Sequence, residues 1–95
     1  MNRRIHQSLR PSPDAVASTH DAGLVLLHVG HGRLFSMNRT AARVWRYVEQ
    51  HLSEDAIAAA IGRDYGLPVD QARQHTGKLL DELCAQGLVI SGTEA

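Results

Sequence analysis

Apolar and polar positions divide the chain into a strand-forming first half and a helical second half. Leu24–Val29 is almost entirely apolar, which predicts a buried central strand. Gly30-His31-Gly32 can supply the positive-φ positions of a hairpin turn, so residues 33–37 are expected to return antiparallel to that strand. Ahead of the central strand, Ala15–His20 predicts a short first strand, which ends at the turn signal Asp21-Ala22-Gly23.

Three helices are predicted after these strands, because capping residues alternate with apolar stripes. Asn38 can accept hydrogen bonds from the free amides of a first helical turn, and Ser53 can do the same for a second helix. Gly66, followed by Pro68, is a typical helix terminator, and Asp70 is expected to open the third helix. The positions that form the three stripes are Ala41, Val44, Trp45, Val48 and Leu52, then Ile57, Ala60 and Ile61, then Ala72, Thr76, Leu79, Leu80 and Leu83.

The predicted third strand, residues 33–37, has no obvious later strand with which to pair. An open sheet edge lets another chain add a strand through main-chain hydrogen bonds, while side-chain pockets provide selectivity. We therefore interpret the chain as an α+β domain, a three-stranded antiparallel sheet followed by three helices. The open edge is interpreted as its functional part.

Both ends of the chain lack a clear apolar pattern. Residues 1–13 are polar and basic and finish in Pro11-Ser12-Pro13, which favours an extended, flexible N-terminal tail. Residues 91–95 are polar and are interpreted as a C-terminal tail. A chain of 95 residues is long enough for one modest core, so residues 14–90 are expected to form a single domain.

Composition and charge narrow the functional classes. A hydrophobic content of 43% is typical of a folded domain, and ten basic residues balance ten acidic ones, so no nucleic-acid partner is expected. No apolar run approaches the roughly 20 residues that a bilayer requires, so no membrane partner is expected. The single cysteine, Cys84, forms no internal disulfide and suits a reducing compartment, so we expect a cytoplasmic protein.

Catalytic and metal-binding signals are weak. Six histidines are present, but His28 and His31 are separated by a turn and no cysteine or carboxylate cluster joins them, whereas structural zinc requires four ligands. Cys84 lies on an apolar helical face near Leu80, as a buried thiol does. Gly30-His31-Gly32 is too short for a phosphate loop and precedes a strand. We therefore expect no enzyme activity, no cofactor and no metal ion.

The segment around the predicted third strand resembles a known family. Gly32-Arg33-Leu34-Phe35-Ser36-Met37-Asn38, followed by Ala42-Arg43-Val44-Trp45, is similar to the G-R-Y-Y-x-L-N-x-T-G-A-x-I-W run of the PqqD-like family. Members of this family are small winged helix-turn-helix modules called RiPP recognition elements. The resemblance covers roughly residues 15–90. The positions that depart from the family pattern are Met37, Ala41, His28 and the pair Leu34-Phe35.

The resemblance implies a protein that binds a leader peptide without catalysing a reaction. In this family the leader of a ribosomally made precursor lies as an extra antiparallel strand beside the third strand. Its side chains enter a groove between that strand and the third helix, and the precursor is presented to a leader protease or another modifying enzyme. Stand-alone members of this size are most similar to the recognition proteins of lasso-peptide biosynthesis. The alternative is a peptide chaperone of pyrroloquinoline quinone biosynthesis that works with a radical SAM enzyme.

The open strand and one side of the third helix carry the predicted leader-binding residues. These are Arg33, Leu34, Phe35, Ser36 and Met37 on the strand, and Arg73, Thr76, Gly77, Leu80, Asp81 and Cys84 on the helix. Glycine at position 77 destabilises the helix by about 1 kcal/mol relative to alanine. The close approach of a ligand strand would explain why a glycine is present there. Packing of Gly77 against a neighbouring helix explains it equally well, and Phe35 and Met37 are equally well explained as core residues.

Two other functions stay open from the sequence. A winged-helix DNA-binding protein needs cations on its recognition helix. The third helix instead mixes both signs, in Asp70, Arg73, Lys78, Asp81 and Glu82. An assembly subunit that dimerises through its open strand is the other alternative. The first helix also has a basic face, which is either solvated or docks a partner enzyme, formed by Arg39, Arg43 and Arg46.

Overall fold

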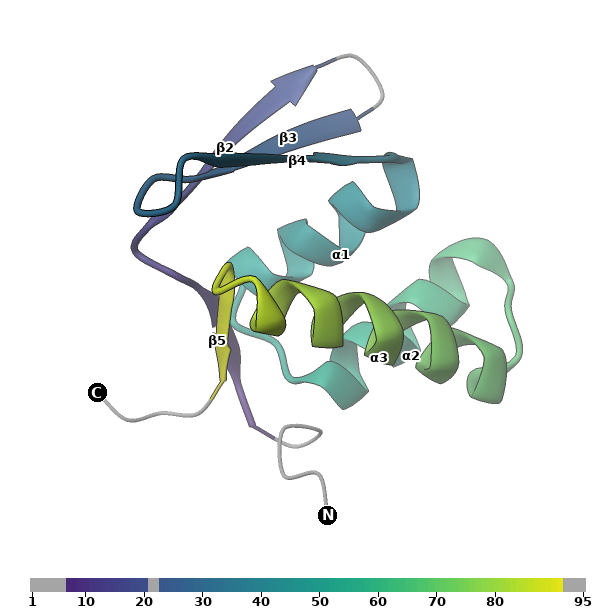
Figure 1. The fold of residues 1–95 in the computed structure, drawn as a ribbon. Helices are drawn as coiled ribbons and strands as arrows, with labels where there is room; N and C mark the ends of the chain where they lie inside the picture. The colour runs from purple at the N-terminus through teal and green to yellow at the C-terminus, as the bar shows by residue number, and fades with distance from the viewer. Residues whose placement is uncertain (1–6, 21–22, 92–95) are drawn as a thin grey trace.

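A computed structural model describes residues 7–20 and 23–91 of the chain. Short strands come first and three helices follow, as Figure 1 shows. The elements in chain order are β1 (Leu9–Pro11), β2 (Ala15–His20), β3 (Gly23–His28), β4 (Arg33–Met37), α1 (Arg39–Glu49), α2 (Glu54–Tyr65), α3 (Val69–Ala85) and β5 (Val89–Ser91). The α+β class predicted from the sequence is confirmed.

Strands β2, β3 and β4 form an antiparallel sheet in that order. β2 and β4 have the predicted bounds, and β3 begins and ends one residue earlier than predicted. The register pairs Leu26 with Phe35 and Leu27 with Leu34. Gly32, with a φ of 63°, takes the left-handed turn position that glycine adopts without strain. The hairpin between β3 and β4 therefore forms where the glycines predicted it.

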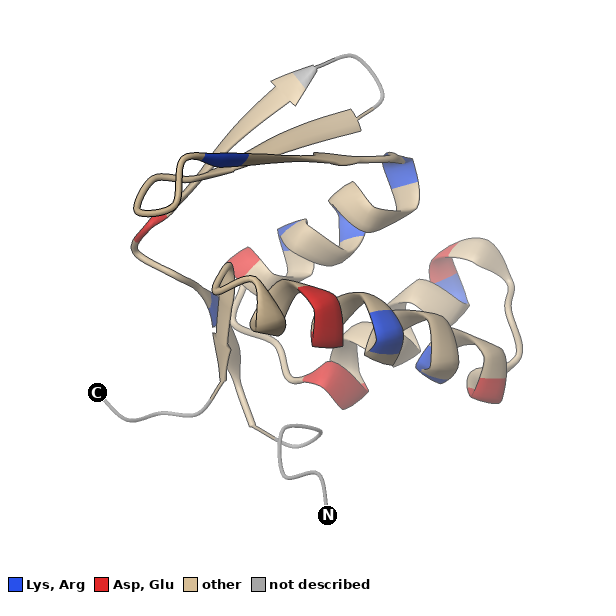
Figure 2. Cartoon of the chain, viewed as in Figure 1, with Lys and Arg blue, Asp and Glu red and all other residues tan. Residues whose placement is uncertain are grey.

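The two faces of this sheet differ, because successive side chains of a strand point to opposite sides. Leu24, Leu26 and His28 of β3 are buried on the face that packs on α1. On the opposite face, Val16 of β2 and Leu34 of β4 are 51% and 68% exposed. Charged residues lie mostly on the helices, as Figure 2 shows. The outer face of the sheet is therefore both solvent-exposed and nearly free of charge.

The helices begin and end at residues that satisfy the free backbone groups there. Asn38 Oδ1 and Ser53 Oγ each accept a hydrogen bond from the backbone N–H three residues later, at 2.9 and 3.1 Å. Gly66 ends α2 in the left-handed conformation, with a φ of 65°. α3 follows Pro68 and begins one residue before the predicted Asp70, without a side-chain cap. The capping predictions for α1 and α2 are confirmed.

The structure corrects the prediction of a flexible tail over residues 1–13. Leu9–Pro11 forms β1, which pairs with β5 in a second, two-stranded antiparallel sheet. Leu9 is fully buried. Ser91, which the sequence assigned to the C-terminal tail, belongs to β5. Residues 1–6 and 92–95 of the two predicted tails lie outside the described residues.

The core surrounds α1, which lies between the sheet and the other two helices (Figure 1). Trp45 is the largest fully buried side chain, and its Nε1–H donates to Glu49 Oε2 at 2.9 Å, so the indole nitrogen is satisfied. The other buried members of the core are Leu9, Leu24, Leu26, Met37, Val44, Val48, Ile57, Ile61, Leu80, Leu83, Leu88 and Val89. Both sheets and all three helices contribute to it, so β1 and β5 are part of the folded domain.

Candidate functional site

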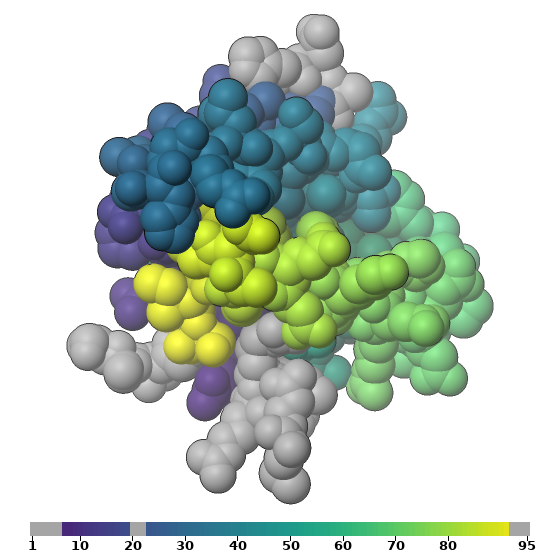
Figure 3. All heavy atoms as spheres, in the orientation of Figure 1, coloured from purple at the N-terminus to yellow at the C-terminus, as the bar shows by residue number. Residues whose placement is uncertain are grey.

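The outer edge of β4 is open and lies beside α3. β4 pairs with β3, and no other strand within residues 7–20 and 23–91 pairs with its second edge. In Figure 3, β4 and α3 adjoin on the front of the molecule. Alternate residues of an edge strand direct their N–H and C=O groups away from the sheet. The outer edge of β2 is also unpaired in the described chain, so the surroundings of β4 decide which edge suits a ligand.

A cleft of about 650 Å³ opens where the chain passes from β4 into α1. It combines apolar side chains with a few hydroxyl, amide and imidazole groups, as ligand clefts do. Its lining residues are Asn38, Thr40 and Ala41 at the start of α1, Ile61, Tyr65 and Leu67 near the end of α2, and Gln71, His75 and Leu79 on α3. A strand added to β4 therefore has this cleft next to the Met37 end of its path, where side chains can enter it.

The predicted strand residues lie at this edge but on two different faces. Phe35 is half-buried against the core and Met37 is buried, so both point toward the helices. Leu34 and Ser36 are exposed on the outer face of the sheet. Met37 is thus a core residue, one of the two explanations that the sequence left open. Phe35 lies at the boundary, where its ring contacts the core and can also contact a ligand.

Arg33 links the start of β4 to the end of α3. Its guanidinium lies 5.6 Å from the centroid of the Phe35 ring and donates to Gln86 Oε1 at 3.3 Å. Because Gln86 follows the last residue of α3, this exposed hydrogen bond joins the start of β4 to the end of α3. The cleft of about 650 Å³ lies beyond the opposite end of β4, where Asn38 lines it.

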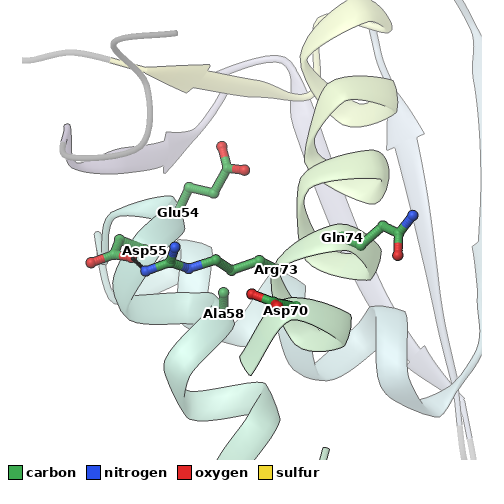
Figure 4. A pocket seen from close by; sticks show the side chains of 6 residues that line it. All are labelled: Glu54, Asp55, Ala58, Asp70, Arg73 and Gln74. Carbon is green, nitrogen blue, oxygen red and sulfur yellow. Dashed lines mark hydrogen bonds and ion pairs between the residues drawn. The ribbon is translucent and has the colours of Figure 1, made fainter. Parts of the chain in front are cut away.

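Two of the predicted α3 residues, Arg73 and Gly77, face α2 and not β4. The Arg73 guanidinium donates to Asp55 Oδ1 at 3.1 Å, across a hollow of about 330 Å³ between α2 and α3 (Figure 4). A Cβ atom added to Gly77 would lie 2.9 Å from Glu54 Oε2. Both positions therefore face the start of α2. The second explanation offered for Gly77, that it packs against a neighbouring helix, is the one that agrees with the structure.

The other predicted α3 residues are buried or lie away from the cleft. Leu80 is fully buried in the core, and Thr76 is 1% exposed, with a hydroxyl that has no hydrogen-bond partner within the described chain. Cys84 is half-buried against the core, and Asp81 is exposed on the Gly77 side of the helix. The structure therefore does not bring Thr76, Leu80 or Asp81 to the open edge.

A different flank of α3 lines the cleft. Gln71, His75 and Leu79 follow one another at four-residue spacing, as neighbours on one side of a helix do. The sequence contains this spacing. The spacing alone does not single out these residues, because the buried stripe of α3 has a flank on each side and either one could face the ligand. Which flank faces the sheet depends on how α3 crosses α1 and α2. That crossing is set by tertiary packing and leaves no signal in the spacing itself.

Replacing Gly77 with alanine tests this placement. The added methyl group has to displace only the flexible end of the Glu54 side chain, and alanine is favoured over glycine in a helix by about 1 kcal/mol. We expect the melting temperature to rise by up to about 4–8 °C and ligand affinity at the β4 edge to stay unchanged. Thermal denaturation and a peptide titration measure the two effects. If the stable variant binds leader more weakly than the wild-type chain does, Gly77 belongs to the binding site.

Metal-binding side chains do not cluster in the described chain. His28 and His31 stack with ring centroids 4.0 Å apart, and His28 Nδ1 accepts the His31 backbone N–H at 3.2 Å, which accounts for the pair as a turn contact. Residues 7–20 and 23–91 contain no group of three or more histidine, cysteine or carboxylate side chains placed to hold a metal ion. None of their helices combines the length and apolar character needed to span a membrane.

Comparisons with known proteins bear on both the fold and the site. The sequence profile of the family described as Coenzyme PQQ synthesis protein D (PqqD) matches residues 23–89. The structure of TbiB1 in complex with the TbiA(beta) leader peptide is 22% identical and covers 90% of this chain and 99% of that one, with a TM-score of 0.81. Lasso peptide synthetase B1 complexed with the leader peptide is 23% identical and covers 87% and 98%, with a TM-score of 0.78. At 22% and 23% identity, the similarity to these two structures establishes the fold alone. No protein of curated function matches the sequence.

Proposed function

This chain belongs to the PqqD family, and on that premise we propose that it binds the leader peptide of a ribosomally synthesised precursor. The leader adds an antiparallel strand to β4, and the chain presents the precursor to a separate enzyme without catalysing a reaction itself. The observation that carries this proposal is the open edge of β4 next to the cleft of about 650 Å³.

Main-chain pairing alone gives such a complex little affinity. The five residues of β4 can share only a few hydrogen bonds with a leader strand. Each is worth roughly 0.5–1.5 kcal/mol net, while ordering the peptide costs about 1–2 kcal/mol per residue. Two or three side chains buried in the cleft, at roughly 1.5–3 kcal/mol each, must therefore supply most of the binding free energy. The leader is recognised by a side-chain motif, and an arbitrary extended peptide does not suffice.

The proposed binding residues come from the β4 edge and the cleft. Arg33–Met37 provides the backbone template, and Phe35 provides the apolar surface on the helix side of the strand. His75 and Leu79 provide the facing wall on α3. The flank of α3 that carries Arg73 and Gly77 is not included, because it faces α2.

We infer that the precursor belongs to a lasso-peptide pathway and that a leader protease receives it. The two solved structures compared above each hold a leader peptide, and one of them is a lasso peptide synthetase B1. This chain covers nearly the whole length of each, 99% and 98%, so the comparison concerns modules of the same size. The family description favours a second candidate, a peptide chaperone of PQQ synthesis that works with a radical SAM enzyme.

Leader binding should protect the backbone of β4 from hydrogen exchange. The probe is the synthetic leader of a candidate precursor, which is to be sought among the short open reading frames that neighbour the gene for this chain. At a leader concentration of about 100 times Kd, exchange of the outward-pointing β4 amides is expected to slow by up to about a hundredfold. Exchange measured by NMR or mass spectrometry reports β4 and β2 separately.

Two controls make this experiment decisive. The core peptide of the same precursor should not bind, because the proposal assigns recognition to the leader. The amides of β2 should exchange at an unchanged rate, because the second open edge has no part in the complex. Protection of β2 in place of β4, or equal binding of leader and core, would contradict the proposed function.

A further inference from the structure

A second cleft, of about 370 Å³, lies between α1 and one end of the β2–β3 hairpin. Among residues 7–20 and 23–91, its lining contains three guanidinium groups and no carboxylate. The residues that line it are Thr19, Gly23, Arg39, Ala42, Arg43, Arg46, Tyr47 and Gln50. We call it the basic cleft. Its arginines account for the blue bands along α1 in Figure 2.

The charges of the basic cleft are only weakly neutralised by the protein. Arg43 and Arg46 approach Asp64 and Glu49 at 3.5 and 3.4 Å, and both arginine side chains are about half exposed. Ion pairs that are this long and this exposed contribute little and exchange readily. Arg39 is exposed, and its guanidinium forms no ion pair or hydrogen bond with any residue in 7–20 or 23–91. The nearby Tyr65 hydroxyl, and next that of Tyr47, raise the pKa of Arg43, and a guanidinium is charged at neutral pH even without such a shift.

Arg39 is placed unfavourably for the stability of its own helix. It is the first residue of α1, and the first turn of α1 contains no acidic side chain. The helix dipole favours negative charge at this end and disfavours a cation. Helix stability therefore does not explain Arg39, whereas recruitment of an anion to the basic cleft does.

The basic cleft and the cleft beside β4 lie on two sides of the same helix. Asn38, Thr40 and Ala41 line the cleft beside β4, and the alternating neighbours Arg39, Ala42 and Arg43 line the basic cleft. A helix with its side chains is about 10–12 Å across. A molecule bound in the basic cleft is therefore within reach of a leader bound on β4.

We propose that the basic cleft docks an aspartate- or glutamate-rich segment of the enzyme that processes the bound leader. This inference rests on the proposed function, because it supposes that a leader-processing enzyme visits the β4 edge. Guanidinium groups pair with carboxylates through parallel hydrogen bonds, which gives geometric selectivity as well as attraction. A duplex nucleic acid would need an extended basic surface, and the chain has no net charge.

The variant Arg39→Glu separates this role from a structural one. It is expected to weaken binding of the leader-processing enzyme by about tenfold or more, measured by calorimetry with leader bound, and candidates for that enzyme are to be sought among the genes that neighbour this one. Leader affinity should stay unchanged, and the melting temperature should stay equal or rise, because an acidic residue suits the first turn of α1. The matched control is Arg63→Glu, an exposed arginine on α2 outside both clefts. It should leave enzyme binding unchanged.

A hexaglutamate peptide tests the cleft without the enzyme. At low ionic strength it should shift the side-chain N–H signals of Arg39, Arg43 and Arg46 saturably, and salt should reverse the shifts. Equal effects of Arg39→Glu and Arg63→Glu, or hexaglutamate shifts elsewhere, would overturn the proposal. If a DNA duplex displaces hexaglutamate at physiological salt, the proposal is overturned and the ligand of the basic cleft is a nucleic acid. If the wild-type chain does not bind leader, the proposed function fails, and the hexaglutamate titration still decides whether the basic cleft takes carboxylates.

Discussion

Replacing Phe35 with alanine is expected to raise the Kd for leader by about two orders of magnitude while the chain stays folded. Phe35 lies at the boundary between the core and the open edge, and its ring is half-buried before any ligand binds. A leader strand on β4 would cover the remaining surface of the ring. Truncation of such an aromatic anchor typically costs about 2–4 kcal/mol, which corresponds to about 30- to 1,000-fold in Kd. Calorimetric titration with the synthetic leader measures it.

The matched control for Phe35 is its neighbour Leu34. Leu34 lies on the same strand, but its side chain is 68% exposed on the opposite face of the sheet. Leu34→Ala should raise Kd by no more than about fivefold, because a cross-strand contact is worth about 0.2–1 kcal/mol. Circular dichroism should show both variants folded, with a lower melting temperature for Phe35→Ala because its ring packs on the core. A larger loss from Leu34→Ala would mean that the outer face recognises the leader.

Local chemistry made the β2–β4 sheet and the helix ends predictable from the sequence. A left-handed glycine at Gly32, side-chain acceptors at Asn38 and Ser53, and a terminator at Gly66 each act within a few residues of their own position. The pairing of β1 with β5 has no such local cause. It joins three-residue segments from opposite ends of the chain, and neither segment is long enough to show a strand pattern.

The candidate site was predictable on the strand and not on the helix. The register of β4 follows from the hairpin, so Phe35 and Leu34 fall on the faces that alternation requires. For α3, periodicity correctly identified the buried stripe that contains Leu80. It could not say which flank of that stripe meets the sheet. Gly77, which looked like space for a ligand, instead gives space to the Glu54 carboxylate.

Replacing Leu80 with aspartate is expected to unfold the domain, although the sequence alone placed this residue in the leader site. Leu80 is fully buried in the core. Burying an unpaired carboxylate costs several kcal/mol, and losing the leucine packing costs about 2–5 kcal/mol more. Domains of this size are stable by only about 5–15 kcal/mol. Circular dichroism should therefore show loss of the helical signal at 25 °C, and leader binding should disappear with it.

The same substitution at the preceding residue, Leu79, separates folding from recognition. Leu79 is half-buried and lines the cleft of about 650 Å³, so an aspartate there can keep its carboxylate in contact with water. Leu79→Asp should retain the helical signal and a cooperative thermal transition. Its affinity for leader should nevertheless fall by about a hundredfold, because the charge occupies the apolar wall that buries leader side chains. If both variants fold and only Leu80→Asp fails to bind leader, the leader lies against the other flank of α3. Loss of binding in folded Leu79→Asp assigns it to the flank that faces β4.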